Sequence, residues 1–261
     1  MSQYLYLPGI YYLFFYFVIY AFMGWCLETV YATLKKGKFV NRGFLNGPFC
    51  PIYGFGVLTL IIFLYPLRNN TVILFLGSVI LTSILEYITG FLLEKFFHAT
   101  WWDYSENKFN IKGRVCLRFS IYWGIFSVIV LKIIHPYVNN LVLLIPEKLG
   151  VILSFILISY FIADIVITVT SIIQLNALLK QLHEISDEIK SKVEILKENT
   201  IERTEVIEAR IHELKGRYEK LISKRHVVHR RILSAFPGLK SRRFDSTLKE
   251  FREKLYNKLN N

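Results

Sequence analysis

Two glutamates within an apolar stretch are the residues whose type and spacing most clearly suggest chemistry. Glu86 and Glu94 lie eight positions apart, with Gly90 midway between them, so in a helix all three share one face. A carboxylate in hydrocarbon costs a few kcal/mol, and such residues usually face a bundle interior or a water-filled cavity. Gly90 would let a neighbouring helix approach closely. We therefore expect both acids to converge on a shared polar site or ion-pair network.

Two loops supply the other candidate residues. The segment 41–56 reads NRGFLNGPFCPIYGFG, which is too rich in Gly and Pro for a regular helix. Such a loop can cradle an anion or a lipid headgroup, or it can be a plain tight connection. The aromatic run WWDY at 101–104 can be an interfacial belt or the floor of a pocket. The candidate pocket residues are Glu28, Asn41, Arg42, Asn46, Glu86, Glu94, Trp101, Trp102, Asp103, Asn110, Arg114 and Arg118.

Arginines in these loops should offset the buried acids. An unpaired acid at this depth would be expensive or would become neutral. At least one of Glu86 and Glu94 should therefore lie within about 4 Å of an arginine, with Arg42, Arg114 and Arg118 as the candidates. Asp164 is the other deep acid, and the sequence names no partner for it. A purely structural ion pair and a functional role remain open for each acid.

Composition indicates the elements that must position these residues. The 261-residue chain is 53% hydrophobic and 16% aromatic, which is typical of membrane proteins. Five apolar runs approach the roughly 20 residues that a spanning helix needs. We therefore predict an all-α, polytopic membrane bundle of about five helices in a domain over 1–175. The predicted spans are 10–34, 50–66, 72–97, 116–136 and 149–176.

The remainder of the chain is charged and predicted to be helical. Residues 180–261 hold thirteen of the 20 acids and twenty of the 32 bases. Apolar residues recur at helical spacing over 176–232, which predicts a long amphipathic helix, or a hairpin if Asn199 and Glu202 cap a second helix. This coiled segment favours self-association or a partner helix over catalysis. The basic tail 233–261 completes the chain, and the basic run 224–243 suits anionic lipids better than nucleic acid.

Several kinds of chemistry have no motif in this chain. Cys26, Cys50 and Cys116 lack CxxC spacing, so neither a zinc site nor a disulfide framework is expected. Walker A, HExxH and GxSxG patterns do not occur. We expect no cofactor and no metal; the chain has no ATPase or hydrolase motif, and enzyme activity is less expected than its absence.

Five short motifs together resemble a known family. They are GWxxE (24–28), NRGFLxGPxxPIYGxG (41–56), ExxxGxxxE (86–94), WWDYSxxxFNxxGR (101–114) and LxxSxxWG (117–124). This set, over roughly 10–175, resembles the bacterial membrane proteins catalogued as putative ABC-transporter permeases of the CmpB type. The segment AFPGLKSRRF (235–244) is also similar to a tail of such proteins. The resemblance implies transport, with the ATPase on a separate chain.

Three functions therefore remain open. The leading one is a permease-like component that moves a solute or lipid through a pocket facing the cytoplasm. The second is a membrane enzyme acting on a lipid headgroup, in which Arg42 and Arg114 hold a phosphate and Glu86 or Glu94 is the general base. The third is a non-catalytic scaffold that acts through the coiled segment. Membrane lipids are expected partners of all three.

Charge asymmetry predicts the orientation in the cell membrane. The 35–48 loop carries four Lys and Arg residues and the 95–118 loop carries five, whereas 67–71 has one and 137–147 has none. The positive-inside rule then places the N-terminus outside and the C-terminal extension in the cytoplasm. A reporter enzyme that works only in the cytoplasm should be active when it is fused after residue 200, and one that works only outside the cell should be inactive there. Activity of an external reporter at that position contradicts the prediction.

Overall fold

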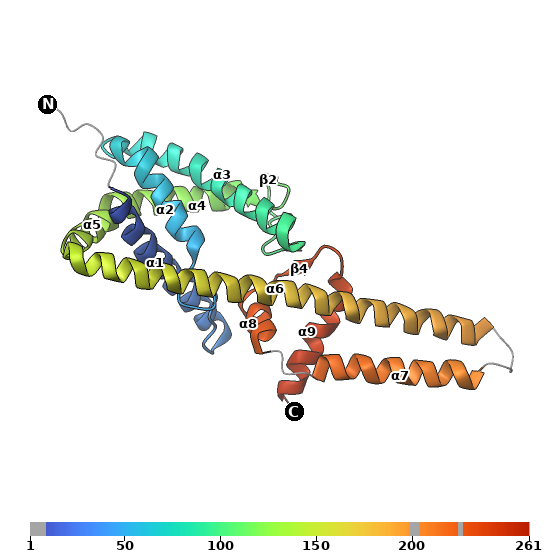
Figure 1. The fold of residues 1–261 in the computed structure, drawn as a ribbon. Coiled ribbons are helices and arrows are strands. Elements are labelled where there is room, and N and C mark those ends of the chain that lie inside the picture. Colours follow the sequence, from blue (N-terminus) through green and yellow to red (C-terminus); the bar gives the residue numbers. More distant parts are fainter. Residues whose placement is uncertain (1–8, 199–203, 224–226, 261) are drawn as a thin grey trace.

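The chain folds into a helical membrane bundle that continues into a long helical extension. The computed structural model describes residues 9–198, 204–223 and 227–260 (Figure 1). The helices are α1 (Ile10–Lys36), α2 (Pro51–Leu64), η1 (Tyr65–Leu67, a 3-10 turn), α3 (Thr71–Phe97), α4 (Leu117–Ile129), η2 (Val130–Ile134, a π-helical turn), α5 (His135–Leu143), α6 (Glu147–Glu198), α7 (Thr204–Ser223), α8 (Val227–Ala235) and α9 (Asp245–Asn260). The strands are β1 (Ala99–Thr100), β2 (Asn110–Ile111), β3 (Val115–Cys116) and β4 (Lys240–Ser241). The predicted all-α membrane architecture is confirmed.

Four helices are long and apolar enough to cross a bilayer. They are α1, α3, the continuous helix formed by α4, η2 and α5, and α6. Their outward faces carry large apolar side chains, such as Phe155 and Ile162 on α6, which remain exposed because lipid rather than protein covers them. The fifth predicted run, 50–66, forms the shorter α2, which rises roughly 21 Å and continues through η1. This is less than the hydrocarbon thickness of about 30 Å.

The helix after the second loop is longer than the sequence predicts. We expected the span 116–136 to end at Pro136 and a connection to follow over 137–147, but the helix continues to Leu143. Proline removes one N–H group and crowds the preceding turn. The wider π-helical turn η2 lies directly before it, and His135 N donates to Val130 O across that turn. The expected connection is therefore confined to a few residues before α6.

The extension is a hairpin. α6 continues without a break past residue 176, and α7 packs antiparallel along it (Figure 1). The proposed caps Asn199 and Glu202 lie outside the described residues. Apolar positions of the predicted stripe, including Leu182 on α6 and Leu214 and Tyr218 on α7, are buried in one core. The stripe that we predicted for self-association is thus covered largely within the chain.

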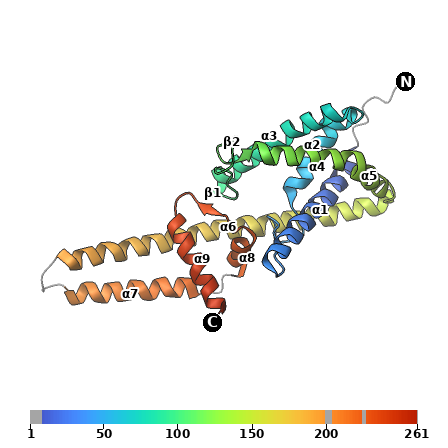
Figure 2. The same ribbon diagram turned by 180° about the vertical axis from the view of Figure 1, so that it is seen from behind.

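The C-terminal segment closes back onto the bundle. α8 and α9 pack against α6, and α9 also contacts α7 (Figure 2). Strand β4 pairs antiparallel with β1, so that Ala99 lies opposite Ser241 and Thr100 opposite Lys240. Leu248 and Phe251 of α9 share a core with Trp101 from the loop after α3. The predicted boundary at 232/233 falls inside α8, because residues on both sides of it belong to this core.

Two substitutions on α7 test the hairpin. Leu214 is fully buried, so Leu214→Ala should cost about 2–5 kcal/mol and lower the thermal midpoint of the full chain in detergent, followed by circular dichroism. Gly216 has open space around a new Cβ. Gly216→Ala should therefore increase the free energy of unfolding by about 0.4–1 kcal/mol and raise the thermal midpoint. Shifts of the same sign in both variants contradict this packing.

Candidate functional site

The segment between α1 and α2 turns back into the bundle. Cys50, just before α2, donates its backbone N–H to Ala21 O at 2.9 Å, and Ala21 lies near the middle of α1. Residues 41–50 therefore form an irregular, re-entrant loop that lies among α1, α2 and α6. Non-helical backbone at membrane depth is tolerated only where protein or a water-filled cavity surrounds it. The partners of this loop's polar groups are consequently the first feature to locate.

Asp164 on α6 satisfies the loop's amides. Its two carboxylate oxygens accept the backbone N–H groups of Asn46 and Gly47, each at 2.8 Å. The Asn46 side chain donates to Thr168 Oγ1 at 2.8 Å. A Cβ on Gly47 would lie 1.7 Å from the hydroxyl oxygen of Tyr160 and 2.9 Å from Asp164 Oδ2, so a larger residue here would displace these side chains. The partner of Asp164 that the sequence could not name is therefore the loop backbone.

The carbonyl groups of the re-entrant loop accept hydrogen bonds from α8. Arg231 on α8 donates to the carbonyls of Gly43, Phe44 and Leu45 at 2.9–3.2 Å. Within the loop, Asn41 accepts from Trp25 Nε1 at 2.8 Å and donates to the Asn46 carbonyl at 2.7 Å. Asn41 and Asn46 thus shape the loop itself.

Glu28, Arg42 and Tyr53 form one cluster at the start of α2. Arg42 Nε lies 3.3 Å from Glu28 Oε2, and the Tyr53 hydroxyl donates to Glu28 Oε1 at 2.7 Å. Arg42 also lies over the ring of Tyr31. Arg42 is therefore the partner of Glu28 and not of Glu86 or Glu94.

Glu94 forms the ion pair that the sequence predicts. Arg114 Nη2 lies 2.6 Å from Glu94 Oε2, and both side chains are buried. Arg242, next to β4, approaches the same oxygen at 3.0 Å. A Cβ on Gly90 would lie 3.3 Å from Trp102 and 3.4 Å from Arg114. The close neighbour at Gly90 is thus the loop after α3 rather than a helix, which corrects our expectation.

The other residues of this loop mostly hold it in place. Asp103 pairs with Lys240 at 2.8 Å, and this contact with those from Ser105 lowers the pKa of Asp103 to about 2. Asn110 donates to the carbonyls of Ser105 and Asn107.

Two tryptophans and one arginine complete the placement of the predicted residues. Trp102 Nε1 donates to Arg114 O, and Trp101 packs edge-on against Phe236. Arg118 turns outward and donates to the hydroxyl of Tyr122. The single pocket that we expected is therefore divided into separate clusters, and Arg118 belongs to none of them.

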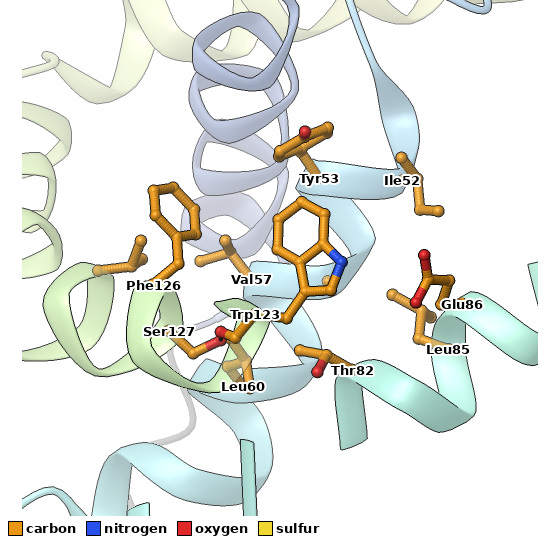
Figure 3. Close-up of a pocket in the computed structure, with 12 residues that line it drawn as sticks. Ile52, Tyr53, Val57, Leu60, Thr82, Leu85, Glu86, Trp123, Phe126 and Ser127 are labelled. Atoms are coloured by element: carbon orange, nitrogen blue, oxygen red, sulfur yellow. Dashed lines mark hydrogen bonds between the residues drawn. The ribbon is translucent and has the colours of Figure 1, made fainter. Parts of the chain in front are cut away.

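Glu86 is the exception among the acids. It is only 8% exposed, and Oε1 accepts the hydroxyl of Tyr104 at 3.2 Å. Its second oxygen, Oε2, has no hydrogen-bond partner among the described residues. Figure 3 shows the carboxylate at the edge of a cavity of about 80 Å³, with the indole nitrogen of Trp123 on the side of the ring that faces it.

The cavity lies between α2, α3 and α4 and is mostly apolar. Its polar lining, apart from Glu86, comes from four residues that we did not predict: Tyr53, Thr82, Trp123 and Ser127. Thr82 lies one turn before Glu86 on α3, and that spacing could have identified it. Tyr53, Trp123 and Ser127 come from other helices. Tyr53 and Trp123 fall within the motifs at 41–56 and 117–124, which is the signal that could have indicated them, whereas Ser127 is identified by packing alone.

Comparison with known proteins adds one finding. A model of the family described as putative ABC-transporter type IV matches residues 15–169. The match covers more than half of the chain and includes the re-entrant loop, Asp164 and the cavity. It ends before Arg231, Lys240 and Arg242. No curated protein and no solved structure matches the chain.

The contact between Asp164 and the loop can be tested by substitution. Asp164→Ala leaves two buried N–H groups without an acceptor, at about 1–3 kcal/mol each. The loop should loosen, and the buried thiol of Cys50 should react with a small thiol reagent roughly tenfold faster or more. Cys26 and Cys116 are replaced by serine in the same background.

Asp187→Ala is the matched control. Asp187 lies on the exposed part of α6, and its contacts with His183 and Lys190 are at the surface, where ion pairs contribute little. This variant should leave Cys50 labelling unchanged. Equal labelling in the two variants would show that Asp164 does not hold the loop.

Proposed function

The chain belongs to the family described as putative ABC-transporter type IV, and from this premise we propose that it is a permease component whose transport route passes through the α2–α3–α4 cavity. The re-entrant loop and the short α2 are the observation that supports this route. In many transporters, discontinuous helices end near the membrane midplane and form the substrate site there. α2 begins level with the middle of α1, directly after Cys50, and Tyr53 and Val57 line the cavity. Irregular backbone and a cavity that borders a buried carboxylate thus meet at one place.

Access from the cytoplasm is controlled by the loop in this proposal. The present cavity has room for a few water molecules only, which makes the described conformation a closed one. Opening it for a solute or lipid requires residues 41–50 to move away from α6. That movement would break the contacts with Asp164 and Arg231. The helical extension is therefore proposed to regulate opening, and a separate ATPase chain is proposed to drive it.

The alternative of a lipid-headgroup enzyme receives less support. It requires arginines free to bind a phosphate, but Arg42 is paired with Glu28, and Arg114 with Glu94. Glu94 is already paired with two arginines and is not open to a substrate hydroxyl. A scaffold acting through the coiled stripe is also less favoured, since much of that stripe is buried within the chain.

Single cysteines test the route. In a chain with its own three cysteines replaced by serine, Thr82→Cys and Ser127→Cys place thiols on the cavity wall. The matched controls are Ile80→Cys on α3 and Ile129→Cys on α4, both on exposed outer faces. A water-soluble thiol reagent applied to inside-out vesicles should label the wall positions and spare the controls, because thiols in lipid do not ionise. Equal labelling of all four, or none at the wall, contradicts the route.

A further inference from the structure

The acids of the bundle differ in what neutralises them. Glu28 has Arg42, and Glu94 has Arg114 and Arg242. Asp164 accepts two backbone N–H groups at 2.8 Å. Glu86 has only neutral donors, the Tyr104 hydroxyl and the indole N–H of Trp123, although it is more than nine-tenths buried. Glu86 therefore lacks the arginine partner that Glu28 and Glu94 each have.

The groups that face Glu86 include no cation. Tyr104 comes from the loop after α3, Trp123 from α4, and Tyr53 from α2. Tyr53 already donates its proton to Glu28, and Arg42 lies beyond it on that same glutamate. Cys116 and Glu28 are the other titratable groups near Tyr104. Among the residues that the structure describes, no Lys, Arg or His lines the cavity. A buried charge without compensation costs more than proton uptake, so the neutral carboxyl is the form that this site accommodates.

The cavity wall offers hydrogen-bond acceptors to a protonated Glu86 Oε2. Thr82 donates its hydroxyl hydrogen to Ser78 O, and Ser127 donates its own to Trp123 O, both at 2.7 Å. The hydroxyl oxygens that line the cavity therefore retain lone pairs for accepting a hydrogen bond. Glu86 Oε2, which lacks a partner among the described residues, is positioned to carry a proton toward them, directly or through water.

Other cationic ligands fit this site poorly. Metal ions such as Ca²⁺ take six to eight oxygen ligands, and Mg²⁺ requires octahedral geometry. Here one carboxylate is available, and the described residues contain no cluster of three or more His, Cys, Asp or Glu side chains. An anion would meet the Glu86 carboxylate without any cation. A proton needs only one carboxylate oxygen, so it is the ligand that this site suits.

We propose that Glu86 is a proton-binding site that couples proton uptake to movement of the transported substrate. The carboxylate takes up one proton and becomes a neutral carboxyl group facing the cavity. Glu28, whose side chain is 30% exposed, and Tyr53 form the entry from the cytoplasm, with cavity water between Tyr53 and Glu86. The coupling rests on the proposed transport function, whereas the proton binding does not.

Infrared spectroscopy of the full-length protein in lipid tests the binding. The carbonyl stretch of a protonated carboxylic acid should appear as the pH is lowered but still lies well above the range near pH ~4 in which exposed Asp and Glu side chains take up protons. It should appear in the same way with sodium or with a large organic cation in the buffer. Glu86→Gln should lose this band and Glu86→Asp should retain one. Glu106→Gln, on the exposed part of the loop, should keep the wild-type band. Circular dichroism checks that the variants fold.

Three results would overturn the proposal. They are the absence of a titrating band in the wild type, a band that survives Glu86→Gln, and a band that sodium suppresses, which would indicate a sodium site. The wild-type measurements remain decisive even if Glu86→Gln does not fold. Because the band is read in resting protein, its outcome is independent of cysteine labelling in the cavity. Failure of proton binding is thus distinguishable from failure of the transport route.

Discussion

Irregular backbone inside a membrane bundle must find hydrogen-bond partners within the protein, and this constraint organises the structure. The re-entrant loop exposes amides that lipid cannot satisfy. Asp164 accepts two of them, and those hydrogen bonds in turn give both oxygens of the carboxyl group in the span a partner. Each group thus satisfies the other. The short α2, which begins where the loop ends, can therefore start in the interior and leave a cavity beside Glu86.

The extension participates in the same arrangement. Arg231 donates to three carbonyls of the loop, and Arg242 shares Glu94 with Arg114. These contacts connect α8 and β4 to two separate places on the membrane domain. The basic residues that seemed available for anionic lipids are partly used within the chain. The extension and the loop are consequently joined by direct hydrogen bonds.

Local pattern was sufficient to predict much of the bundle. Apolar runs identified the helices, and helical spacing placed Glu86 and Glu94 on one face. Pairing of Glu94 with a loop arginine followed from the cost of an unpaired buried acid. Glu94 has an arginine partner and Glu86 has none. This difference depends on which loop residue contacts each turn of α3, and helical spacing does not determine that. Hydropathy likewise could not show that α2 starts in the interior, because a short buried helix and a span are equally apolar.

Long-range polar contacts were also beyond the sequence. Arg231 and Arg242 are far from the loop and from Glu94 along the chain, and no periodicity links them. Tyr53, Trp123 and Ser127 are neutral residues on different helices, so their convergence depends on packing alone. The π-helical turn before Pro136 was unpredictable for a similar reason, since its neighbours decide whether a proline ends a helix or is accommodated.

The burial of the loop at membrane depth is most directly measured by hydrogen–deuterium exchange of the protein in lipid. The backbone N–H groups of Asn46 and Gly47 should exchange as slowly as those in the middle of α1, because Asp164 accepts both hydrogen bonds. The exposed loop around Glu106 provides the fast reference in the same experiment. Exchange of Asn46 and Gly47 at the rate of that exposed loop would contradict a pinned, re-entrant segment.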